Sequence, residues 1–257
     1  ASRFDAIVPA MPAPDWLPQR SRDLVDAALA ACVTVMPDVL RAVCLIGGAA
    51  RRERDLRGSA ELLELLIVVE QLPSARLPTL AEGLREPLKG GLQLRTVTRQ
   101  ELHGSADVQA LELAEWRDHH VLLHGEDPFA ALVIAPADLR HEIERALRGL
   151  SQRLRNRLLW CMATEQRRLD VVLREGVDLL LNLAHHTLAL VEQAPEPSDG
   201  ALLGQFGAWV GVEVEAIDAL RERLLAGQAA GDPLAELGSL AAVIEAACAR
   251  VDGLEIG

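Results

Sequence analysis

Residues 44–70 read CLIGGAARRERDLRGSAELLELLIVVE and place two apolar runs around a glycine pair. Residues 42–46 and residues 63–69 have the length and the branched side chains of buried β-strands. Gly47 and Gly48 directly follow the first run and predict a tight turn. Acidic side chains accompany the second run. A strand, a glycine turn and a second strand with carboxylates form a unit suited to holding a metal ion and a phosphate group.

Helices and strands alternate around this unit in the first half of the chain. The apolar spacing in residues 21–37 predicts a helix that Ser21 caps and that ends near Pro37. Two further short apolar runs predict strands, and the polar segments between the runs are typical of helical connections. These are strands at 92–97 and 121–123, and helical connections at 73–91 and 99–118. We therefore expect a small mixed sheet with helices packed on it.

The second half has helical periodicity throughout. A long amphipathic helix begins at Pro136 or Asp138, and its leucines recur every three to four residues. Further helices are expected within 167–193, 211–227 and 232–251, with connections at 194–200 and 227–233. We predict an α+β protein with two domains, a mixed-sheet domain over residues 1–134 and an all-α helical bundle over residues 135–257.

Composition excludes several classes of function. The chain has 26 Lys and Arg against 38 Asp and Glu, a net charge of -12, and only 3% aromatic residues. Such a chain repels phosphate backbones and lacks stacking platforms, so we expect no general nucleic-acid binding. No apolar run approaches the roughly 18 residues of a membrane span, and the first residues lack the cationic start of a signal peptide. We expect a cytoplasmic protein that makes no membrane contact.

Cysteine and histidine spacing gives no metal motif. Cys32, Cys44, Cys161 and Cys248 lie far apart, without a CxxC pair, and are expected to be buried free thiols. Two histidine pairs are adjacent in sequence, so only one ring of each pair should face a given site; these are His119–His120 and His185–His186. We expect His185 or His186 to be a core histidine. His124 is interpreted as a turn residue, with a polar cleft residue as the alternative.

Charge is segregated within the predicted bundle. Residues 140–174 hold nine Arg and four acids, whereas residues 175–257 hold three Arg and fourteen acids. The basic helix is expected to pair with acidic helices of its own bundle. The alternative is that it faces an anionic ligand or another subunit.

Several segments together resemble the polymerase-beta-like nucleotidyltransferase superfamily, especially its small bacterial members with a C-terminal helical bundle. Gly47-Gly48 match the family's glycine turn after the first strand. LLELLIVVE at 62–70 is similar to the family's second strand, LQLRTVTRQEL at 92–102 to a neighbouring strand, and VLLHGEDPF at 121–129 to the segment that closes the domain. The resemblance implies a nucleotidyltransferase-like sheet domain with a nucleotide cleft between the sheet face and the bundle.

The resemblance also implies a degenerate active site. The family's carboxylate pair falls on Leu62 and Glu64, and its third carboxylate on Gln93 or Arg95. Two-metal transfer needs two or three acids on one face. Glu61 and Glu64 are three residues apart and should face opposite sides of a strand. An active Mg²⁺-dependent enzyme would need Glu61 and Glu64 as catalytic metal ligands, or rescue by Glu70 or Glu101.

The leading hypothesis is therefore a nucleotidyltransferase-like protein without two-metal catalysis, which binds or regulates through the old cleft and needs no cofactor. Arg95 would neutralise Glu64 in place of a metal. Gly47, Gly48, Arg51, Arg52 and Arg95 would hold a nucleotide or another anionic small ligand, although a solvated arginine helix is the favoured interpretation of the loop. The alternatives are an active nucleotidyltransferase that modifies a small hydroxyl compound or a protein, and an antitoxin-like or oligomerisation module. Either a homodimer or a protein partner fits this chain.

Overall fold

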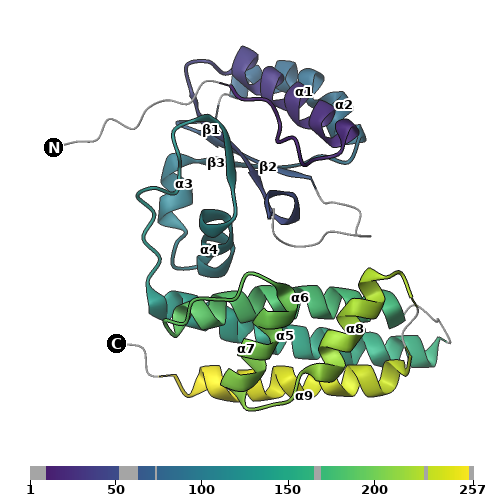
Figure 1. The fold of residues 1–257 in the computed structure, drawn as a ribbon. Helices are drawn as coiled ribbons and strands as arrows, with labels where there is room; N and C mark the ends of the chain where they lie inside the picture. The colour runs from purple at the N-terminus through teal and green to yellow at the C-terminus, as the bar shows by residue number, and fades with distance from the viewer. Residues whose placement is uncertain (1–9, 52–62, 73, 165–168, 229–230, 255–257) are drawn as a thin grey trace. The chain divides into compact units, whose positions relative to one another are not determined.

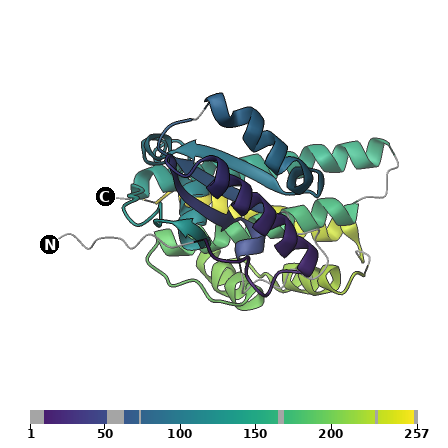
Figure 2. The same ribbon diagram turned by 90° about the horizontal axis from the view of Figure 1, so that it is seen from above.

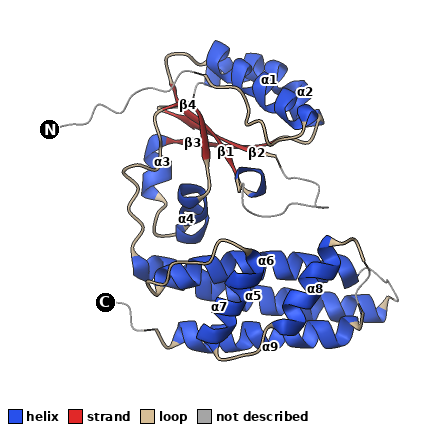
Figure 3. Cartoon of the chain, in the orientation of Figure 1, coloured by secondary structure: helices blue, strands red, loops and turns tan. Residues whose placement is uncertain are grey.

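The computed structural model describes residues 10–51, 63–72, 74–164, 169–228 and 231–254. The chain divides into two compact units, Ala1–Ile134 and Ala135–Gly257. In the described residues, every strand lies in the first unit, and the second unit consists of helices and their connections (Figure 3). The α+β class predicted from the sequence is confirmed, with a mixed sheet followed by a helical region.

The described part of the first unit forms a four-stranded mixed sheet in the order β3-β2-β1-β4. β1 (Leu40–Ile46) is antiparallel to both β2 (Glu64–Val69) and β4 (Val121–Gly125), whereas β2 is parallel to β3 (Gln93–Thr98). The parallel pair requires a crossover, which the α2 helix supplies. The predicted strands are confirmed to within a few residues at their ends.

Helices cover both faces of this sheet. α1 (Gln19–Val35) and α2 (Leu77–Lys89) pack side by side on one face, with α3 (Arg99–Gly104) and α4 (Ala110–Asp118) on the other (Figures 1 and 2). The central strands β1 and β2 are therefore almost wholly buried, which explains their continuous apolar runs. β3, at the edge, is mostly exposed and carries polar side chains. Short 3₁₀ turns occur at Gly48–Ala50 (η1) and Ser74–Arg76 (η2).

One local prediction in the first unit is wrong, and another is confirmed in more detail. α1 begins at Gln19 after Pro18, and no side chain caps it, so Ser21 lies within the first turn. Pro18 has extended backbone angles and so lies outside the helix, which begins directly after it. The predicted helical connection at 99–118 is confirmed and consists of two helices, because Thr98 and Glu101 form a capping box for a short α3 that ends before Ser105.

The second unit contains α5 (Pro136–Ala163), α6 (Leu169–Leu190), α7 (Asp199–Val210), α8 (Glu215–Leu225) and α9 (Pro233–Asp252). α5, α6 and α9 pack against one another, and α7 and α8 pack on α6 and α9. α5 starts at Pro136, one of the two starts predicted. Within the described residues, no helix is both long and apolar enough to cross a membrane.

α7 was not predicted. Its sequence, DGALLGQFGAWV, contains three glycines, which lower helix propensity, and it shows no polar stripe along one side. Leu203 and Phe206 are fully buried against neighbouring helices. Tertiary packing therefore stabilises a helix that periodicity does not reveal.

The cysteine and charge predictions hold in part for the described residues, because Cys248 is not fully buried and several α5 arginines pair with glutamates of α5 itself. Cys32, Cys44 and Cys161 are buried free thiols, and Cys248 is half-buried and also free. Burial raises the pKa of the Cys32 thiol to about 12, so this thiol is inert at neutral pH. In the bundle, Arg155 of α5 pairs with Glu245 of α9, as expected for a basic helix beside an acidic one.

Candidate functional site

The Gly47 turn follows β1 and lies against a carboxylate. Gly47 has φ 70° and ψ -155°, backbone angles that side-chain-bearing residues rarely adopt. The N–H of Ala50 donates to the Gly47 carbonyl across 3.1 Å, which closes the turn. A Cβ atom at Gly47 would lie 3.0 Å from Glu64 Oε2. Glycine thus permits both the turn and the close approach of the glutamate.

Glu64 opens β2 and pairs with an arginine from the neighbouring strand. Residue 64 is in register with Gln93, so Glu64 and Arg95 project from the same face of the sheet. The Arg95 Nε–H donates to Glu64 Oε1 across 3.0 Å, and the Glu64 side chain is 16% exposed. The pairing of Arg95 with Glu64 predicted from the sequence is present.

A second carboxylate reaches the same guanidinium from α4. Arg95 Nη2 lies 3.6 Å from Glu112 Oε1. Burial raises the pKa of Glu112, the nearby Glu64 adds to the increase, and Arg95 acts in the opposite direction. The hydrogen bond that Arg95 donates to Glu64 raises the pKa of Arg95, so its guanidinium stays charged. Two carboxylates from β2 and α4 therefore share one cation.

A second ion pair lies one helical turn further along α4. Arg51, directly after η1, pairs with Glu115, and their side chains are only 12% and 10% exposed. Glu112 and Glu115 are three residues apart and so lie on the same side of the helix. We call the five residues Arg51, Glu64, Arg95, Glu112 and Glu115 the carboxylate–arginine cluster.

The described residues of this cluster do not fit a two-metal centre. Arg95 holds a positive charge between Glu64 and Glu112, where it would repel a divalent cation. Two other glutamates that the sequence offered as replacement metal ligands, Glu70 and Glu101, form interactions elsewhere. Glu70 pairs with Arg41 beyond the opposite end of β2, and Glu101 caps α3.

The sequence predicted that some residues of the carboxylate–arginine cluster share one site, but it did not predict the others. Gly47, Gly48, Glu64 and Arg95 occupy one end of the β1–β2–β3 region, as expected. Glu61 and Arg52 lie outside the described residues. Arg51 is in its ion pair with Glu115. Its role in binding phosphate stays a prediction, as does a cleft that also involves the bundle.

Glu112 and Glu115 were not predicted as site residues. Their spacing on a helix was visible in the sequence, but nothing local indicated that α4 faces β3.

The histidines are not members of the carboxylate–arginine cluster. His124 is within β4, so its interpretation as a turn residue is wrong: antiparallel pairing with Val43 of β1 extends the strand past it. The His120 ring contacts Phe129, with ring centroids 4.7 Å apart, and its Nε2 lies 3.4 Å from Asp127 Oδ1.

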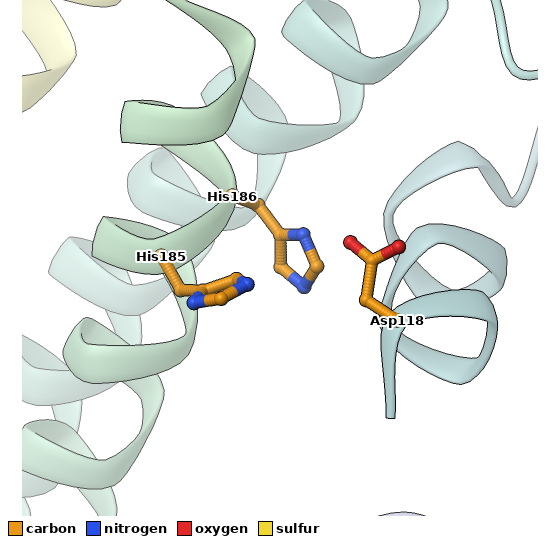
Figure 4. Close-up of side chains that lie close together, drawn as sticks. All are labelled: Asp118, His185 and His186. Atoms are coloured by element: carbon orange, nitrogen blue, oxygen red, sulfur yellow. The ribbon is translucent and has the colours of Figure 1, made fainter. Parts of the chain in front are cut away.

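His185 and His186 are neighbours on α6 (Figure 4). His186 is buried, as expected of a core histidine. The two rings meet edge to face with centroids 5.1 Å apart, so sequence adjacency did not separate them as predicted. Asp118, also drawn in Figure 4, belongs to the first unit, where it pairs with Arg117.

The fold and site thus define a two-unit α+β protein with a carboxylate–arginine cluster beside a glycine turn. Comparison with protein-family models gave no match, and a search of curated proteins found no relative of this chain.

Proposed function

We propose that the first unit is a nucleotidyltransferase-like domain that binds a nucleotide or another anionic small ligand without metal and has lost nucleotidyl transfer. The observation that carries this proposal is the position of Arg95 between Glu64 and Glu112, beside the Gly47 turn. A guanidinium on two carboxylates supplies the positive charge that a metal ion would otherwise provide.

Arg95 also retains capacity to bind a ligand. Its side chain is 51% exposed, and its contacts with Glu64 and Glu112 use Nε and Nη2. Arginine has five N–H donors, so donors on Nη1 remain for a phosphate or carboxylate.

Calorimetry of the 257-residue chain with ATP and GTP, first with Mg²⁺ and then with EDTA, tests the proposal. We expect binding that persists in EDTA and that Arg95→Gln weakens about tenfold. Arg99→Gln is the matched control, because Arg99 is a similarly exposed arginine that pairs with Glu126.

The two other outcomes separate the alternative functions. Affinity that disappears in EDTA would overturn the proposal in favour of an active Mg²⁺-dependent enzyme. No binding in either buffer would also overturn it, and would direct the search toward a protein partner or an oligomerisation role.

A further inference from the structure

α5 and α6 of the second unit enclose a groove of about 560 Å³. Its floor is apolar: Leu150, Leu154 and Val172 line it and are each less than 5% exposed. Leu179 and Trp160 also line the groove and are 41% and 42% exposed, so the apolar lining continues to the surface. The volume falls within the range of small-molecule sites.

Two arginines of α5 line the same groove. Arg153 and Arg157 are exposed, and neither has a carboxylate partner within the described residues. Other arginines of α5 are paired: Arg148 with Glu144 and Arg155 with Glu245. The segregated positive charge of this helix is therefore neutralised along much of its length but not at the groove.

Trp160 orients one of these arginines. The Arg157 guanidinium carbon lies 4.9 Å from the centroid of the Trp160 ring, a cation–π contact that leaves the N–H edge of the guanidinium available. Glu175 of α6 is the acidic residue in the lining, so two arginines stand against one glutamate. The groove combines an apolar floor with a net positive wall.

We propose that this groove binds an amphiphilic anion, a small molecule with an apolar body and a carboxylate or phosphate head. The body would occupy the leucine and valine floor, where burial of apolar surface favours binding. The head would accept hydrogen bonds from Arg153 and Arg157, because guanidinium groups match the geometry of both anions. This site is independent of the carboxylate–arginine cluster in the first unit.

Decanoate, below its critical micelle concentration, is the first probe, and calorimetry on the 257-residue chain is the measurement. Decanol and decyltrimethylammonium carry the same chain with a neutral or a positive head. We expect decanoate to bind at least about tenfold more tightly than either control. Decyl phosphate distinguishes the head groups. If it binds more tightly than decanoate, the proposal stands and the head is a phosphate.

Matched variants place the binding in the groove. The double substitution Arg153→Gln with Arg157→Gln should weaken decanoate binding about tenfold, while Arg155→Gln, on the same helix but outside the groove, should leave it within about twofold. A ligand-induced change in tryptophan fluorescence should disappear in Trp160→Phe. Equal binding of decanoate and decanol, no binding of any anionic probe, or an equal loss in Arg155→Gln would overturn the proposal. Thermal melts confirm that each variant is folded.

Discussion

Arg95 and Glu64 stand on neighbouring parallel strands and meet across 3.0 Å, with the same glutamate carboxylate lying against the Gly47 turn. The start of β2, the Gly47 turn and the Arg95 guanidinium therefore lie together at one end of the sheet. The pair also receives Glu112 from α4, which makes Arg95 the shared partner of two acids.

Replacing Arg95 with a carboxylate should create a metal site. Arg95→Asp removes the cation and leaves three acids near one another, so Mn²⁺ affinity should rise at least about tenfold over the unsubstituted chain. Calorimetry or Mn²⁺ electron paramagnetic resonance measures the change. Arg99→Asp adds the same charge elsewhere and should have little effect. Equal gains in both variants would show that net charge alone attracts the ion.

The Arg51–Glu115 pair should contribute more to folding than exposed pairs. Both side chains are nearly buried, so Arg51→Ala removes a cation from beside a buried carboxylate and should lower the free energy of unfolding by about 3 kcal/mol. Arg41→Ala breaks the exposed pair with Glu70 and should cost less than about 1 kcal/mol. Urea denaturation measures both. Similar losses in the two variants would contradict this ranking.

Gly47→Ala should destabilise the first unit for two reasons. The positive φ disfavours any side chain, and the new Cβ would meet Glu64 Oε2 at 3.0 Å. We expect a loss of about 1–3 kcal/mol in chemical denaturation. Gly104→Ala, where an added Cβ meets nothing within 4 Å, is the control and should be close to neutral. A neutral Gly47→Ala would show that the turn tolerates a side chain.

The stability of the chain should depend on pH through Glu112. Its pKa is raised in the folded state, chiefly by burial, so its contribution is fully present below its ordinary pKa and is lost as pH rises through the folded value. Glu112→Gln should therefore become more stable relative to the unsubstituted chain as pH rises from the ordinary glutamate range toward neutrality. Thermal melts across that window measure the difference.

Glu101 provides a control of opposite sign. Hydrogen bonds from the backbone and the side chain of Thr98 lower its pKa, so its contribution is present above its ordinary pKa and is lost as pH falls through the folded value. Glu101→Gln should thus lose stability relative to the unsubstituted chain at neutral pH but not in acid. The same trend with pH in both variants would contradict the two assignments.

Local sequence determined the strands of the sheet and the long helix α5. The branched apolar runs of β1 and β2 predicted buried strands, because both faces of those strands are covered. Gly47 predicted the turn because few other residues adopt its backbone angles. The leucine spacing of α5 predicted its amphipathic character, and Pro136 was one of the two starts predicted. The pairing of Arg95 with Glu64 was expected from the family resemblance, which placed their two strands side by side.

Only the tertiary structure decided which elements meet. α7 forms because neighbouring helices bury its apolar surface, a contribution that no local pattern reports. Glu112 and Glu115 join the cluster because α4 packs on the face of the sheet that carries Arg95, which the spacing of two acids on a helix does not reveal. Periodicity is a property of neighbours along the chain, whereas a site is made by residues that folding brings together.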